Sequence, residues 1–278
     1  MKWNKTALVT GGSSGIGKGI AIVLAKHGYD VAITYGNNQQ GAEDTYNEIN
    51  ALGRKCFIYQ ASLEDVQPST DCVKQAIADL GHLTLLVNNA GRTKFHSVLT
   101  ITAEEMQYLY DLNFRSYILA SGEAARHMVE NEIRGSIIFN TSVRGNRAFA
   151  NDILYGSLKA ALNRAAKSMA LDLAPYGIRV NCIAPGATAK ETFKQENHQL
   201  LANAIPLSRM GTPKDCGELV AFLACEDKSG YITGVTIEVD GGLTLPGMVE
   251  SSKNPQLIHS QTDPDWFEQV RKQLKEMK

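Results

Sequence analysis

The sequence lacks the features that mark membrane, secreted and nucleic-acid-binding proteins. No apolar run approaches the roughly 20 residues that a membrane-spanning helix needs, and the first apolar segment stops at Gly11, too short for a secretory leader. The 28 Lys and Arg residues nearly balance the 29 Asp and Glu residues, so no global positive field attracts nucleic acid or an anionic membrane. We therefore expect a cytoplasmic protein that binds neither nucleic acid nor membranes.

Cysteine and histidine are also sparse. The five cysteines form no Cys-x-x-Cys pair, which favours buried thiols in a reducing compartment over disulfides or zinc ligands. The six histidines are scattered, and none forms a convincing ligand set with Asp, Glu or Cys. No metal site is expected.

Short β-branched runs alternate with segments of helical period along most of the chain. The expected strands span residues 7–10, 30–34, 55–60, 83–87, 136–139, 179–183 and 236–239, and the expected helices span 16–27, 40–52, 68–80, 103–131 and 153–176. Strands that are apolar on both faces and separated by helices are typical of a covered parallel sheet. The sequence therefore predicts an α/β, doubly wound Rossmann fold of about seven parallel strands with helices on both faces.

The composition of the sequence changes at Leu243. Before it, no linker or internal repeat divides the chain, so we expect residues 1–242 to form a single domain. After it, Pro, Gly, Ser and Asn predict a loop, and an apolar stripe then predicts a helix over residues 263–277. Residues 243–278 are expected to be a C-terminal extension.

A glycine-rich loop follows the first expected strand and opens a helix. It reads Thr10-Gly-Gly-Ser-Ser-Gly-Ile-Gly17. Glycines let a backbone approach a pyrophosphate, whose charge is met by free N–H groups and the positive end of the helix dipole. Taken alone, the loop could also be a tight turn without a ligand. The candidate contacts are Gly11, Ser13, Ser14, Gly15, Ile16 and Gly17.

Tyr155 and Lys159 lie four residues apart on an expected helix and so share one face. A neighbouring ammonium favours a phenolate, so we expect the pKa of Tyr155 to fall below its usual value of about 10. Most Tyr-x-x-x-Lys pairs on helices are plain surface pairs. A catalytic interpretation therefore needs support from other motifs.

Such support comes from a resemblance to the short-chain dehydrogenase/reductase family, and Leu245-Pro-Gly-Met248 at the start of the extension resembles its sugar-dehydrogenase-like members. The family resemblance covers residues 5–242 in order and spacing. It rests on the glycine loop, Asn88-Asn-Ala-Gly91, Asn113, Ser142, Tyr155-Gly-Ser-Leu-Lys159, Pro185-Gly186, Tyr231-Ile-Thr-Gly234 and Val239-Asp-Gly-Gly242. The resemblance implies one catalytic domain that transfers hydride between a nicotinamide and an alcohol or carbonyl carbon.

The resemblance also implies the catalytic residues Asn113, Ser142, Tyr155 and Lys159. Tyr155 would exchange the hydroxyl proton, and Ser142 would hydrogen-bond the substrate oxygen. Asn113 would bend its helix and hold a water in a relay to Lys159. The plainer alternatives are that Ser142 caps a strand end and that Asn113 is a tolerated polar residue.

Cofactor contacts are implied in the same way. Beside the glycine loop they are Thr34, Asn37, Asn38, Ser62, Leu63, Asn89, Ala90, Gly91, Tyr155, Lys159, Pro185, Gly186 and Thr188. No acid after the second expected strand repels a 2′-phosphate, and Asn37 and Asn38 could donate to it, which favours NADP(H). NAD(H) remains possible, because Ser14 and Gly36 stand where many NADP-using relatives carry basic residues.

Two of these positions depart from the family pattern. Ser62 replaces an adenine-binding aspartate, and Lys190 replaces a threonine that holds the nicotinamide carboxamide. We therefore expect the backbone around Thr188, or Thr192, to hold the nicotinamide carboxamide.

The loops expected around the substrate are basic. Their cations are Arg92, Lys94, Arg144, Arg147 and Lys190. They predict a polar or anionic small molecule such as a sugar, polyol or oxo acid. Each cation could instead face solvent or pair with Asp152, Glu191 or Glu196.

Two other functions stay open. Within the family, the chain could reduce a 3-oxoacyl thioester on an acyl carrier protein. In another class, it could be a non-catalytic dinucleotide-binding sensor or structural subunit, although the four intact catalytic residues argue against this. Relatives are commonly tetramers, so the resemblance implies a homotetramer.

Overall fold

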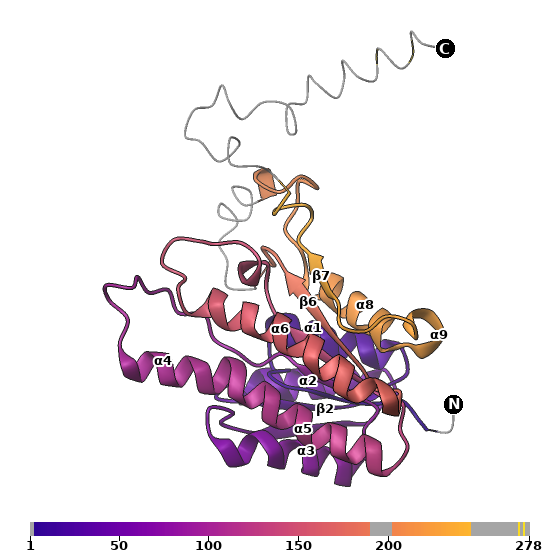
Figure 1. Cartoon of the computed structure of the whole chain (residues 1–278). Helices are drawn as coiled ribbons and strands as arrows, with labels where there is room; N and C mark the ends of the chain where they lie inside the picture. The colour runs from indigo at the N-terminus through magenta and orange to yellow at the C-terminus, as the bar shows by residue number, and fades with distance from the viewer. Residues whose placement is uncertain (1–2, 190–201, 246–271, 273–274, 276–278) are drawn as a thin grey trace.

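Seven strands form one parallel sheet in the computed structural model of the chain, which describes residues 3–189, 202–245, 272 and 275 (Figure 1). Their order across the sheet is β3-β2-β1-β4-β5-β6-β7. The strands are β1 (Thr6–Val9), β2 (Asp30–Tyr35), β3 (Cys56–Gln60), β4 (Leu85–Asn88), β5 (Ser136–Asn140), β6 (Arg179–Pro185) and β7 (Thr236–Val239). The predicted doubly wound fold is confirmed.

Helices cover both faces of the sheet (Figure 1). On one face lie α1 (Gly15–Lys26), α2 (Gln39–Ala51) and α8 (Pro213–Ala224); on the other lie α3 (Val66–Leu80), α5 (Ser116–Glu130) and α6 (Tyr155–Leu173). Successive residues of a strand point to opposite faces of the sheet, so Leu8 packs against α3 and α5 whereas Ala7 packs against α1. Shorter elements are α4 (Ala103–Tyr110), η2 (Val143–Gly145), η3 (Ala174–Tyr176) and α9 (Glu226–Ser229).

The strand order reverses between β1 and β4, which are neighbours in the sheet. Crossovers leave this point in opposite directions, so the loops after β1 and β4 face each other across a crevice at the carboxyl ends of the strands. Ligands of open α/β sheets bind at such a point. The topology therefore brings together the glycine loop and the Asn88–Gly91 segment.

Two helical regions differ from the expectation. The single helix expected over residues 103–131 is divided by η1 (Asp111–Arg115), a π-helical turn, between α4 and α5. Helix α8 was not expected, because Gly217 obscures its helical period. A capping box of Thr212 and Asp215 fixes its start.

The structure also bears on the expected state of the cysteines and on membrane-spanning helices. All five cysteines are free thiols, and four are buried, as predicted: Cys56, Cys72, Cys182 and Cys216, with Cys225 partly exposed. No helix in the described part of the chain is long and apolar enough to cross a membrane. The expected helix over residues 263–277 lies almost wholly outside the described residues, as do Lys190 and Thr192.

Close packing of α1 on α8 leads to a stability prediction. A Cβ at Gly19 would collide with Pro213, at the first turn of α8. We expect Gly19→Ala to lower the free energy of unfolding by about 1–3 kcal/mol, because the two helices would have to separate. Urea denaturation measures this change.

Gly122→Ala on α5 is the matched control. A Cβ there meets only the tip of Arg126, at 3.6 Å, so alanine should be neutral or stabilise the helix. Equal stability of Gly19→Ala and the unmodified chain would contradict the packing account.

Candidate active site

The glycine loop presents the start of α1 to the crevice. Ser14 is the N-cap residue, but its side chain makes no capping bond, and the first turn contains no acidic residue. A Cβ at Gly17 would collide with the carbonyl oxygen of Gly11, so only glycine lets the helix begin this close to the loop. The first-turn N–H groups are thus placed to receive an anion.

Asn89 joins the ends of three strands. Its Nδ2 donates to the carbonyl oxygens of Thr10 (2.8 Å) and Gly11 (3.2 Å), and its Oδ1 accepts from Nδ2 of Asn140 (2.7 Å). The hydroxyl of Thr10 in turn accepts from the backbone N–H groups of Asn89 (2.8 Å) and Ala90 (3.0 Å). The ends of β1, β4 and β5 are therefore one hydrogen-bonded unit.

The three expected cofactor residues at the end of β2 and just after it have different surroundings. Thr34 is buried beneath the loop, and its hydroxyl accepts from the N–H of Gly11 at 3.0 Å, so this side chain supports the loop. Asn38 caps α2 and donates to the carbonyl oxygen of Ser13 at 3.3 Å. Asn37 is exposed and makes no hydrogen bond within the described residues. Of the three, Asn37 is the most available to a ligand.

The remaining expected contacts flank the crevice. Ser62 is exposed after β3, whereas Leu63 is buried in the core. Pro185 ends β6, and a Cβ at the following Gly186 would lie 2.6 Å from the Cβ of Asp240. The hydroxyl of Thr188 donates to the carbonyl oxygen of Gly186 at 3.3 Å.

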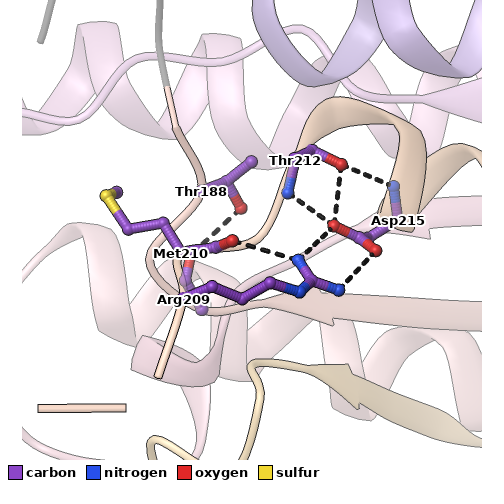
Figure 2. Close-up of polar contacts among 6 residues, drawn as sticks. Thr188, Arg209, Met210, Thr212 and Asp215 are labelled. Atoms are coloured by element: carbon purple, nitrogen blue, oxygen red, sulfur yellow. Dashed lines mark hydrogen bonds and ion pairs between the residues drawn. The ribbon is translucent and has the colours of Figure 1, made fainter. Parts of the chain in front are cut away.

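The segment around Thr188 is tied to the start of α8. Thr188 and Gly211 form a parallel bridge, and Figure 2 shows Thr188 beside the network that follows. Arg209 pairs with both carboxylate oxygens of Asp215, each at 2.9 Å, and Thr212 donates to the same carboxylate. These bonds hold the pKa of Asp215 well below its usual range. The backbone at Thr188 is therefore fixed on the α8 side.

Tyr155 and Ser142 lie together at the end of β5. Ser142 is buried; its Oγ accepts from the N–H of Arg144 at 3.2 Å, and its hydroxyl also hydrogen-bonds Tyr155. The hydroxyl of Thr93, in the loop after β4, makes a second hydrogen bond to Tyr155. Ser142 thus both caps the 3₁₀ turn and contacts Tyr155.

The expected low pKa of Tyr155 is wrong in this structure. Burial disfavours the phenolate and raises the pKa of Tyr155 above its usual value. The hydrogen bonds from Thr93 and Ser142 and the charge of Arg144 lower this pKa, but burial outweighs them. The Nζ of Lys159 lies over the Tyr155 ring, 5.5 Å from its centroid.

Lys159 instead binds groups on β5 and α5. Its Nζ donates to the carbonyl oxygen of Asn140 at 2.8 Å and to the hydroxyl of Tyr117 at 3.3 Å. Lys159 is buried, which lowers the pKa of its ammonium to about 7, while the neighbouring Cys182 acts in the opposite direction. The charge of Lys159 therefore changes near neutral pH.

Asn113 sits in the π-helical turn, fully buried. Its Nδ2 donates to the carbonyl oxygens of Arg92 and Leu109, and its Oδ1 accepts from the N–H of Arg92, each at 3.1 Å. The irregular helix implied at this residue is present. Its side-chain amide clamps the loop after β4 to η1.

Three comparisons with known proteins agree with this geometry. A family model described as enoyl-(acyl carrier protein) reductase matches residues 11–244. A 3-oxoacyl-(acyl-carrier-protein) reductase of Staphylococcus aureus is 37% identical over 248 residues, which cover 88% of this chain and 100% of the relative. An L-rhamnose 1-dehydrogenase (NAD(P)(+)) of a Sphingomonas species is 33% identical and covers 86% of this chain and 96% of itself.

A solved short-chain dehydrogenase from Burkholderia cenocepacia, in complex with NADP, superposes with a TM-score of 0.80 at 34% identity. The match covers 86% of this chain and 97% of that protein. The chain belongs to the short-chain dehydrogenase/reductase family. Members of this family are NAD(P)-dependent oxidoreductases that act on CH–OH groups, and the chain is one of them.

The crevice of this family member fits a nicotinamide dinucleotide. The uncapped start of α1 would receive the pyrophosphate, Asn37 would face the adenosine ribose, and Thr188 would face the nicotinamide end. No group of three His, Cys, Asp or Glu residues in the described ranges could hold a metal ion.

Most of the expected substrate cations already have partners. Arg144 pairs with buried Asp152 at 3.0 Å, Lys94 pairs with Glu105 at 3.4 Å, and Arg147 donates to the carbonyl oxygen of Thr244 at 2.7 Å. Arg92 is exposed and forms no ion pair within the described residues, and Lys190 lies outside them. Pairing within the chain, which the sequence left open as an alternative, thus holds for Arg144 and Lys94.

Arg144 is also enclosed by two aromatic rings. Its guanidinium carbon lies 4.8 Å from the Phe95 ring centroid and 4.2 Å from that of Phe149. A hollow of about 480 Å³ opens beside this cluster, but neither Ser142 nor Tyr155 lines it. The hollow is therefore distinct from the pair of Ser142 and Tyr155.

Sequence reasoning missed Thr93, Asn140 and Tyr117. Thr93 lies in the loop after β4 and Asn140 is the last residue of β5, and no motif reveals that these positions face the site. Tyr117 stands four residues after Asn113 on the same helical region, and this spacing is the one signal that could have drawn attention to it.

Proposed function

We propose that the chain interconverts an alcohol and a carbonyl group on a small, polar, uncharged molecule, a sugar or a polyol, with NADP(H) as the favoured cofactor. The observation that carries this proposal is the hydrogen-bonded cluster of Ser142, Tyr155 and Thr93 beside the crevice. The compensated charges of Arg144 and Lys94 favour an uncharged substrate over an oxo acid. A sugar dehydrogenase among the relatives supports the same class.

Each catalytic side chain has a defined part in this reaction. The bound nicotinamide accepts or supplies hydride. When an alcohol is oxidised, the Tyr155 phenolate takes the hydroxyl proton; when a carbonyl is reduced, the Tyr155 hydroxyl returns it to the same oxygen. Ser142 donates a hydrogen bond to that oxygen, and the Lys159 ammonium stabilises negative charge nearby.

NADP(H) is favoured by the residues after β2. This segment carries no carboxylate to repel a 2′-phosphate, and the exposed amide of Asn37 can donate to one. A related solved structure holds NADP, which supports the assignment.

Reduction of a 3-oxoacyl thioester is the second candidate. The relatives with this activity reach 37% identity and are covered over their full length.

We also propose that the protein is cytoplasmic and forms a homotetramer. The exposed apolar side chains of Val98, Leu99 and Met106, at and before α4, support the assembly into a homotetramer.

Replacing Tyr155 tests the function. We expect the unmodified chain to turn over a sugar or polyol in a nicotinamide absorbance screen that also contains oxo acids, oxo esters and an acetoacetyl thioester. Tyr155→Phe should reduce kcat by about 100- to 10,000-fold, because no group remains to exchange the proton. Burial raises the pKa of Tyr155, so oxidation, which needs the phenolate, should accelerate as pH rises, and reduction should slow.

Tyr176→Phe, at an exposed position on η3, is the control and should keep full activity. Turnover of the acetoacetyl thioester alone would establish the second candidate instead. Full activity in Tyr155→Phe, or none in the unmodified chain, would overturn a catalytic role and favour a dinucleotide sensor.

Replacing Asn37 tests the cofactor assignment. Asn37→Asp places a carboxylate where the 2′-phosphate is expected, so kcat/KM with NADP should fall more than about tenfold through like-charge repulsion. The value with NAD should change much less. Steady-state kinetics with both cofactors measure the ratio.

Asn47→Asp makes the same charge change on the exposed face of α2 and should leave the ratio unchanged. An unchanged ratio in Asn37→Asp would place the 2′-phosphate elsewhere.

A further inference from the structure

Tyr117 is a buried ionisable group to which the proposed reaction assigns no part. It lies on α5, its side chain is 1% exposed, and its ring packs edge-on against Phe139 at 5.6 Å between centroids. A phenylalanine would fill this space equally well, and a buried hydroxyl is costly unless it is hydrogen-bonded. The hydroxyl therefore needs a reason.

Its partners supply that reason. The hydroxyl of Tyr117 donates to the carbonyl oxygen of Asn140 at 3.4 Å and accepts from Nζ of Lys159 at 3.3 Å. Lys159 donates to the same carbonyl oxygen at 2.8 Å, so the three groups form a closed triangle. Because Lys159 and Tyr117 both donate to this carbonyl oxygen, the Tyr117 hydroxyl contributes mainly as an acceptor for the Lys159 ammonium.

The surroundings of Lys159 make this acceptor important. Its Nζ lies 5.0 Å from the Tyr117 ring centroid on α5 and 5.5 Å from that of Tyr155 on α6, and Cys182 faces it from β6. No carboxylate in the described part of the chain pairs with Lys159. The ammonium is thus held by one carbonyl, one hydroxyl and two ring faces.

We propose that Tyr117 is a positioning residue for Lys159: its hydroxyl and the Asn140 carbonyl together hold the ammonium between the two tyrosine rings, beside the group that exchanges the proton. This inference rests on the proposed function only in assigning that exchange to Tyr155. Tyr117 itself stays neutral, because burial raises its pKa well above its usual value.

The direct test is the titration of Lys159 by NMR of protein carrying ¹³C-labelled lysine. The Lys159 signal is identified by its absence from Lys159→Arg. In Tyr117→Phe the ammonium loses one of its two acceptors, so we expect the pKa of Lys159 to fall by about 0.5 to 1 pH unit below that of the unmodified chain. A pKa within about 0.2 pH unit of the unmodified chain would overturn the inference.

Tyr29→Phe is the matched control. Tyr29 is also a buried phenol, but it lies at the start of β2 and has no contact with Lys159. It should leave the Lys159 titration unchanged. An equal displacement in both variants would mean that loosening of the core, and not the Tyr117 hydroxyl, causes the effect, and would also overturn the inference.

If Tyr117→Phe fails to fold, 3-fluorotyrosine incorporated at position 117 keeps the shape and the hydroxyl but weakens the oxygen as an acceptor. The pKa of Lys159 should then fall in the same direction by a smaller amount, and an unchanged titration would overturn the inference.

A kinetic measurement links the Tyr117 hydroxyl to the reaction. In Tyr117→Phe we expect the acid limb of the pH profile of kcat for alcohol oxidation to move to higher pH. At pH 7, kcat should be about three- to tenfold lower, and the KM for the cofactor should be unchanged. The NMR titration needs no substrate, so it decides the inference by itself. An unmodified chain that oxidises nothing in the screen overturns the proposed function alone.

Discussion

The side-chain amide of Asn89 is the interaction on which the site depends. It binds the backbone of the glycine loop on one side and Asn140 on the other, across three neighbouring strand ends. The carbonyl of Asn140 then holds both Lys159 and Tyr117. Through one amide, the glycine loop and the buried Lys159 and Tyr117 belong to a single hydrogen-bonded unit.

Burial sets the electrostatics of that unit. Lys159 is buried, and the loss of hydration lowers the pKa of its ammonium to about 7. Tyr155 is also buried, and the loss of hydration outweighs the hydrogen bonds from Thr93 and Ser142 and the charge of Arg144, so its pKa rises. Burial thus moves the two pKa values in opposite directions: the charge of Lys159 changes near neutral pH, whereas the Tyr155 hydroxyl keeps its proton there and forms the phenolate more readily as pH rises.

The sequence predicted the seven strands because their apolar runs are bounded by clear breaks, and motif spacing shared with the family gave the candidate site residues. It could not predict features set by tertiary contacts. The four-residue spacing places Tyr155 and Lys159 on one face, but the direction of Nζ depends on Asn140, which is distant in sequence. Likewise, the sequence left open whether Arg144 faces a ligand or pairs with Asp152, and the fold decides for the ion pair.

Amide hydrogen exchange in Asn89→Ala tests the central claim most directly. The lost amide leaves the carbonyl oxygens of Thr10 and Gly11 and the side-chain Nδ2 of Asn140 without this partner, so we expect exchange to accelerate about 5- to 100-fold at Gly12 and at Thr141, beyond β1 and β5. Ile237 in β7 should exchange as before. Acceleration confined to β4 and its following loop would contradict the account, because the three strand ends would then not depend on one side chain.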